Sequence, residues 1–141
     1  MYSFRIYNEH PDTAATYNNI ADVYNSQGDY PKALEWFKKA LAIFEKSLGK
    51  EHPDLAITYY NIAFVYSLQE DYLKALEWYQ KNLAINEKVF GKEHHITRNV
   101  REKYVIHSIN PINLSIPYSL VRIHIIISPK SQLQIKKELG K

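Results

Sequence analysis

Histidine is the side chain best suited to catalytic or metal chemistry in this sequence, which has six histidines and no cysteine. Without cysteine the chain can form neither a disulfide nor a thiolate nucleophile. No two histidines have the spacing of a helix-borne zinc motif, and adjacent His94 and His95 would point about 100° apart on a helix. His10, His52 and His94 recur at a constant interval, which favours structural roles. We therefore predict no metal site.

The other chemistry-bearing residues do not form a catalytic set either. The four glycines are too scattered for a phosphate-binding loop. Acidic side chains fall on the polar faces of expected helices, where charge is the default. Trp36 and Trp78 occupy equivalent places in two similar segments, which favours packing over a cofactor site. The sequence therefore predicts a protein that is not an enzyme and has no cofactor.

The chain repeats itself at an interval of 42 residues. Residues 10–51 and 52–93 are identical at 28 of 42 aligned positions. The strings HPD and KALEW occur once in each copy, and GKEH occurs at the end of each copy, at Gly49 and Gly91. A repeat of this length is typical of an array of small units that stack on one another.

Each copy has the apolar pattern of two helices. Tyr17, Ile20, Ala21 and Tyr24 lie at i, i+3, i+4 and i+7, which places them on one helical face. We expect four antiparallel helices at about 11–27, 31–48, 53–69 and 73–90, started by first-turn prolines or ended by glycines where these occur. The expected packing and turn positions are Tyr17, Ala21, Tyr24, Gly28, Ala33, Phe37, Tyr59, Ala63, Tyr66, Ala75 and Tyr79.

This pattern of Tyr17, Ala21, Tyr24, Ala33 and Phe37 resembles the tetratricopeptide repeat (TPR). The 42-residue spacing and the GKEHPD linker resemble the longer subtype found in kinesin light chains. The resemblance covers residues 10–93 and implies an all-α fold, a right-handed superhelical stack of antiparallel helix pairs. We divide the chain into an extension at 1–9, repeats at 10–51 and 52–93, a degenerate third start at 94–107, and a tail of unknown structure at 108–141.

The second copy departs from the first at three informative positions. Glu70 replaces Gly28, so that either its turn is not left-handed or the turn is strained. Asn82 and Asn86 replace two apolar residues of the second helix, and we expect their face to be wet, as on a terminal repeat. After Thr97 the pattern is lost, and prolines in the tail oppose a long helix there. We therefore expect residues 108–141 not to form a third repeat; a changed reading frame or a lineage-specific tail would explain them.

The resemblance also implies a binding face. In this family the first helix of each unit lines a concave surface that holds an extended peptide. Asn19 and Asn61 match such positions, and their amides can both donate to and accept from a peptide backbone. The neighbouring residues expected to add selectivity are Asp22, Asn25, Tyr60 and Phe64. The alternative role for the asparagines is hydrogen bonding between helices. The lysine that binds terminal carboxylates in the family is missing, because Asn18 and Tyr60 stand there.

Two functional hypotheses follow. The first is a module for protein–protein interaction that binds a peptide or partner protein. The alternative is a structural fragment of a longer array, or a self-associating unit, because about three repeats are usually needed for stability. Residues 1–97 carry a net charge of −3 and residues 98–141 of +6, but the basic residues do not cluster, so no nucleic-acid partner is expected. No apolar run is long enough for a membrane span and no signal peptide is visible, so we expect a cytoplasmic protein.

Overall fold

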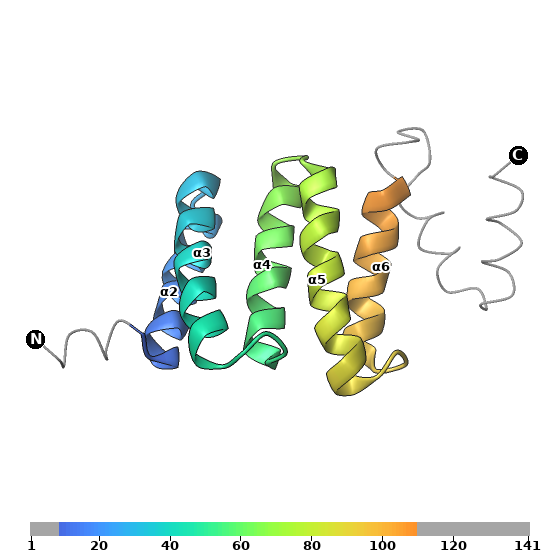
Figure 1. Cartoon of the computed structure of the whole chain (residues 1–141). Helices are drawn as coiled ribbons and strands as arrows, with labels where there is room; N and C mark the ends of the chain where they lie inside the picture. Colours follow the sequence, from blue (N-terminus) through green and yellow to red (C-terminus); the bar gives the residue numbers. More distant parts are fainter. Residues whose placement is uncertain (1–8, 110–141) are drawn as a thin grey trace, which may run out of the picture.

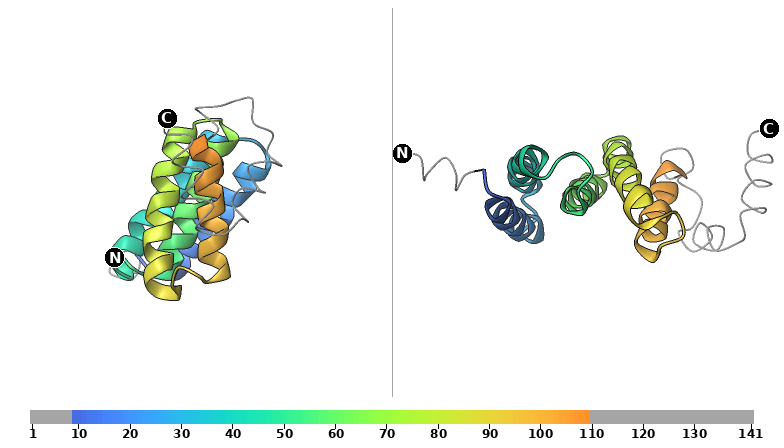
Figure 2. Two further views of the ribbon diagram at one scale, coloured as in Figure 1. Left: turned by 90° about the vertical axis from the view of Figure 1, so that its right-hand side faces the viewer. Right: turned by 60° about the horizontal axis from the view of Figure 1, so that its bottom comes forward.

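The computed structural model describes residues 9–109, and these form five α-helices without a strand. The helices are α2 (Pro11–Ser26), α3 (Tyr30–Ser47), α4 (Pro53–Leu68), α5 (Tyr72–Phe90) and α6 (His95–Ile109). Figure 1 shows them side by side in chain order. The end-on view in Figure 2 places α2, α4 and α6 in one row and α3 and α5 in a second. The expected all-α stack of antiparallel pairs is confirmed over this part of the chain.

Repeated side-chain caps set where the helices begin. His10 Nδ1 accepts a hydrogen bond from Asp12 N at 3.1 Å, and His52 Nδ1 accepts one from Asp54 N at 3.2 Å. Each satisfies a backbone N–H that has no partner within its own helix. Asp29 caps α3 in the same way, by accepting from Lys32 N at 3.3 Å. The four expected helices agree with α2 to α5 within two residues at each end.

Small residues allow the helices of each pair to pack closely. Ala21, Ala33, Ala63 and Ala75 are all 0% exposed, and the fully buried Phe37 fills the first pair. Each helix packs chiefly against its neighbours in sequence, with the most extensive contact within the pairs α2–α3 and α4–α5. The core is therefore a chain of helix–helix interfaces, as in a solenoid.

Aromatic contacts recur at equivalent places in the two pairs. The ring centroids of Tyr17 and Trp36 lie 5.1 Å apart, and those of Tyr59 and Trp78 lie 5.6 Å apart. The Tyr59 hydroxyl also donates a hydrogen bond to Glu45 at 3.2 Å, and burial with this carboxylate raises the pKa of Tyr59 to about 12. Both tryptophans serve as packing residues in this arrangement.

The turn after α4 is left-handed in spite of its glutamate. Glu70 has a φ of 61°, against 77° for Gly28 in the equivalent turn. The backbone bonds also correspond, since Asp29 N donates to Tyr24 O at 2.9 Å and Asp71 N to Tyr66 O at 3.0 Å. The strained alternative for the second copy is therefore the one that the structure adopts.

Helix α6 extends the stack beyond the region where the sequence pattern is lost. It begins at residue 95, 42 residues after α4 begins at 53, as α4 begins 42 after α2 at 11. Thr97 is 0% and Val100 3% exposed against α5. The expectation that every packing residue is lost after Thr97 was wrong, because Val100 and Ile106, at the positions of Thr58 and Phe64, are 3% and 6% exposed although the tyrosines are replaced by Arg101 and Ser108. The tail from residue 110, including its prolines, lies outside the described residues.

Candidate functional site

The row of first helices, α2, α4 and α6, presents the predicted binding residues at different depths. Asn19 and Asp22 are exposed on α2, whereas Asn25 and Asn61 are half-buried. Partial burial of its carboxyl raises the pKa of Asp22. The amide oxygen of Asn25 is buried and has no hydrogen-bond partner within the described residues. The two repeat-equivalent asparagines Asn19 and Asn61 therefore differ in how open they are.

Tyr60 and Phe64 lie one turn apart on α4 and form the second predicted group. Tyr60 is half-buried with its ring packed edge-to-face on Tyr79, at 5.6 Å between centroids. Phe64 is 39% exposed. Of the six predicted binding residues, Tyr60 alone lines the pocket described below.

Hydrogen bonding between first helices is carried by a residue that the sequence analysis did not select for this role. Asn18 Nδ2 donates to Thr58 Oγ1 at 3.0 Å and joins α2 to α4. Thr58 is 0% exposed, and its hydroxyl in turn donates to Asp54 O at 3.1 Å. The structural role considered for Asn19 and Asn61 is thus filled at Asn18, one residue before Asn19.

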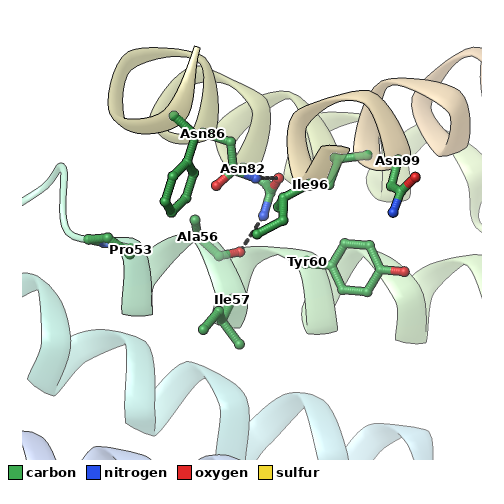
Figure 3. A pocket seen from close by; sticks show the side chains of 10 residues that line it. Pro53, Ala56, Ile57, Tyr60, Asn82, Asn86, Ile96 and Asn99 are labelled. Carbon is green, nitrogen blue, oxygen red and sulfur yellow. Dashed lines mark hydrogen bonds between the residues drawn. The ribbon is translucent and has the colours of Figure 1, made fainter. Parts of the chain in front are cut away.

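A pocket of about 320 Å³ opens between α4, α5 and α6. Figure 3 shows its lining from the three helices. Helix α4 contributes Pro53, Ala56, Ile57 and Tyr60; α5 contributes Asn82, Asn86 and Phe90; α6 contributes Ile96, Asn99 and Val100. The volume is within the range of small-ligand sites, about 300–1,000 Å³. The pocket lies between two first helices, α4 and α6, and the second helix α5 completes its lining.

The two asparagines of α5 are buried, so the expected wet face was wrong. Asn82 and Asn86 are each 3% exposed. Asn82 Nδ2 donates to Ala56 O at 2.5 Å, and Asn86 Nδ2 donates to Asn82 Oδ1 at 2.7 Å. Thr97 Oγ1 of α6 donates to the backbone oxygen of Asn86 at 3.4 Å. Burial is tolerated because the amides bond to each other and to a helix backbone.

Sequence reasoning missed the apolar rim of the pocket. Ile57 is 56%, Phe90 40% and Ile96 39% exposed, and all three line it. The sequence offered one signal for this rim, a large apolar residue such as Ile57 on a helix face that was expected to be polar. Asn82 and Asn86 were noticed, but they were interpreted as marking a solvated end rather than a pocket.

Other kinds of site find little support in the part of the chain that the structure describes. Over residues 9–109 no group of three or more His, Asp or Glu side chains is arranged to hold a metal ion. Within the same range, no helix is both long and apolar enough to cross a bilayer. The pocket between α4 and α6 is therefore the feature of the described region that we take as the candidate site.

Comparison with known proteins agrees with the arrangement of the helices. A family model described as tetratricopeptide repeat matches residues 12–87 and 54–104, the second match reaching into α6. A search of curated proteins found no match. Among solved structures, BtubC (BKLC) from P. vanneervenii superposes with a TM-score of 0.68 at 20% identity, covering 74% of this chain and 42% of that one.

Two structures of kinesin light chain-like TPR repeats from Podosopora anserina are also similar. One has a TM-score of 0.63 at 21% identity and covers 78% of this chain and 60% of that one. The other, a variant with a single substitution, has a TM-score of 0.65 at 19% identity and covers 95% and 60%. The chain thus spans less than two thirds of each of these proteins, and the likeness shows the fold they share.

Proposed function

Since the chain belongs to the tetratricopeptide repeat family, we propose that it is a protein-interaction module that binds a peptide or partner protein on the row of α2, α4 and α6. Repeats of this family are generally interaction modules, and members are typically scaffolds without catalysis. The observation that carries the proposal is the pocket between α4 and α6, with its apolar rim of Ile57, Phe90 and Ile96. Exposed apolar side chains around a concave site mark interaction surfaces.

The binding face also offers groups for a peptide backbone. Asn19 is exposed and Asn61 half-buried, and each amide can donate and accept at once. Asp22, Asn25, Tyr60 and Phe64 lie on the same two helices and would discriminate among side chains. In this proposal the asparagines hold the peptide backbone and the pocket takes a side chain.

A peptide array probed with the full chain tests the proposal. Selective binding of a subset of peptides, weakened by Ile57→Asp on the rim and unchanged by the matched exposed change Val23→Asp on α2, would support it. Equal binding by parent and Ile57→Asp would place the interaction on another surface. Circular dichroism of both variants controls for loss of the fold.

The alternative is a structural unit that stacks on another repeat, and one observation favours it. Val23 on α2 is 54% exposed, whereas its equivalent Val65 on α4 is fully buried. Tyr17 is likewise half-buried while the equivalent Tyr59 is 9% exposed. Sedimentation over a concentration series distinguishes the two: a monomer supports the module, and an oligomer that Val23→Asp dissociates supports stacking.

The same proposal extends to where the protein is located and to the absence of catalysis. We infer a cytoplasmic protein that catalyses no reaction, binds no cofactor or metal, and has neither nucleic acid nor membrane as its partner. The absence of cysteine is compatible with a reducing compartment. Reproducible turnover abolished by changing one side chain would contradict the non-enzymatic part.

A further inference from the structure

We propose that His107 is an acid-sensitive latch that holds the second half of α6 against α5, so that its protonation releases residues 103–109 from the stack. The inference goes beyond the proposed function, because it concerns the docking of a helix and not the binding of a peptide. Three features carry it: the rings that contact His107, the environment of its Nδ1 atom, and the residues at the equivalent places of α3 and α4.

His107 is half-buried against two tyrosine rings of α5. Its ring centroid lies 5.5 Å from that of Tyr72 and 5.5 Å from that of Tyr79, each at an interplanar angle of 46°. Tyr79 is 0% exposed and also packs on Tyr60 of α4, at 5.6 Å between centroids. Because Tyr60 lines the candidate pocket, release of His107 removes a support of one pocket wall.

The environment of Nδ1 favours the neutral imidazole. His107 Nδ1 is buried and has no hydrogen-bond partner within the described residues. A neutral ring can leave this nitrogen as a bare acceptor and carry its hydrogen on Nε2, whereas protonation makes both nitrogens donors. The new N–H and its charge would be buried without an acceptor beside them, which costs more than a buried neutral acceptor.

The charges on α6 and α4 do not compensate the proton. Lys103, one turn earlier on α6, repels it, and burial together with this smaller repulsion lowers the pKa of His107. The only formally charged side chain of α4 is Asp54, which lies in the first turn of that helix, whereas His107 lies in the last turn of α6. Neither helix therefore offers His107 a carboxylate.

The carboxylates on and next to α5 are already paired where the structure shows their contacts. Glu87 accepts from Arg101 of α6 at 2.8 Å, and Asp71, which caps α5, lies 2.9 Å from Lys74 Nζ. The α5 groups that contact His107 are tyrosine rings, whose hydroxyls are neutral near pH 6. No ion pair within residues 9–109 includes His107.

Apolar residues occupy the equivalent places of the preceding helices. In the 42-residue register, Tyr79 corresponds to Phe37 of α3 and His107 to Val65 of α4. Phe37 and Val65 are each 0% exposed. An apolar residue fills the place of His107 without a titratable group, so the histidine adds a dependence on pH that packing alone does not need.

The first half of α6 is held by contacts that mild acid leaves intact. The buried Thr97 hydroxyl donates to the backbone oxygen of Asn86 at 3.4 Å, and Arg101 pairs with Glu87 at 2.8 Å. None of these groups has an ordinary pKa between 5 and 8. Protonation therefore frees only the half of the helix that carries His107.

Proton linkage gives the direction and the size of the effect. In the released helix the imidazole has its ordinary pKa of 6.5, and in the docked helix the pKa is lower. Docking is therefore at its strongest well above pH 6.5 and weakens as the pH falls below that value. From pH 8 to pH 5 the ratio of released to docked helix should rise by up to about 30-fold, the limit for a docked form that takes up no proton.

NMR of the full chain tests the latch. Heteronuclear NOE values of the backbone amides and the imidazole signals of His107 are recorded from pH 8 to pH 5. The amides of residues 103–109 should lose order as His107 is protonated, while those of α2 and of residues 95–101 stay constant. His107→Val, the residue at the equivalent place of α4, should keep residues 103–109 ordered down to pH 5.

Two variants serve as matched controls. His95→Val removes an exposed histidine from the same helix and should respond to acid as the parent does. Tyr79→Phe restores the ring of the first repeat and keeps His107, so acid should still release the helix. Should His107→Val not fold at pH 8, His107→Gln replaces it, because glutamine is polar and does not titrate.

Each outcome decides for or against the latch. Loss of order confined to residues 103–109 in the parent, and absent from the His107 variant that folds, supports it. Unchanged order in the parent at pH 5, or the same loss in that variant, overturns it. Simultaneous loss of order in α2 shows general unfolding and overturns it as well.

Discussion

Replacing Glu70 by glycine should stabilise the protein, although it removes a side chain and adds nothing to the core. Glu70 has a φ of 61°, a left-handed conformation that is unfavourable for a residue with a Cβ by about 1–2 kcal/mol. Glycine removes this strain but makes the unfolded chain more flexible, which offsets about 0.5–1 kcal/mol. We expect a net gain of about 0.5–1 kcal/mol, equivalent to a rise of about 2–8 °C in Tm.

The first repeat supplies a matched reverse change. Gly28 has a φ of 77°, and a Cβ placed there would meet no atom within 4 Å. Gly28→Glu should therefore lose a similar amount through backbone strain alone, without a clash. The double exchange of Gly28→Glu with Glu70→Gly should be close to neutral, since distant changes add. Glu70→Gln, which keeps the strain and removes the charge, should match the parent.

Urea unfolding followed by far-ultraviolet circular dichroism measures these differences as midpoints at constant m value. If Glu70→Gly is no more stable than the parent while Gly28→Glu is clearly less stable, the two turns are not equivalent and the strain argument fails. A large change in Glu70→Gln would instead assign the effect to charge.

Three further perturbations have expected outcomes. Ala33→Leu should lower the unfolding free energy by about 1–3 kcal/mol, because Ala33 is 0% exposed between helices; an unchanged urea midpoint would contradict that packing. Burial lowers the pKa of His107, so on acidification the unfolded chain is protonated before the folded one, and the free energy of unfolding should fall as the pH drops below about 6.5. His107→Phe should reduce this dependence of stability on pH, and an unaltered pH profile in that variant would contradict the role given to His107. Ending the chain after Glu93 removes α6 and uncovers Tyr79, which is 0% exposed and packs its ring against His107. The melting temperature should therefore drop well below that of the full chain, and an equal melt would show that α6 contributes nothing.

The sequence alone predicted the helices well because their signals are local. Pro11 and Pro53 stand in first turns, and the apolar spacing of Tyr17 to Tyr24 identifies the buried face without reference to any partner. The sequence shows that Glu70 stands where the first repeat has glycine, but only the backbone of the folded chain shows that its turn is left-handed and strained.

The pocket could not be predicted because it depends on which groups meet across three helices. Asn82 and Asn86 are polar residues on an apolar stripe, and their burial requires the backbone oxygen of Ala56 on another helix. Helix α6 was underestimated because the comparison considered the tyrosine positions, which hold Arg101 and Ser108, whereas Val100 is buried at the position of Thr58. Asn19, Asn61, Asp22, Asn25, Tyr60 and Phe64 stay predictions as binding residues.

Since each helix packs chiefly against its neighbours in sequence, local unfolding of residues 9–109 should begin at the two ends of that described stack. The candidate pocket uses one of those ends, because Ile96, Asn99 and Val100 all come from α6. Occupancy of the pocket and docking of α6 are then thermodynamically linked: a ligand that needs the docked helix also holds it in place. Hydrogen exchange in α6 should slow when the pocket is filled, while α2, at the far end, keeps its own rate.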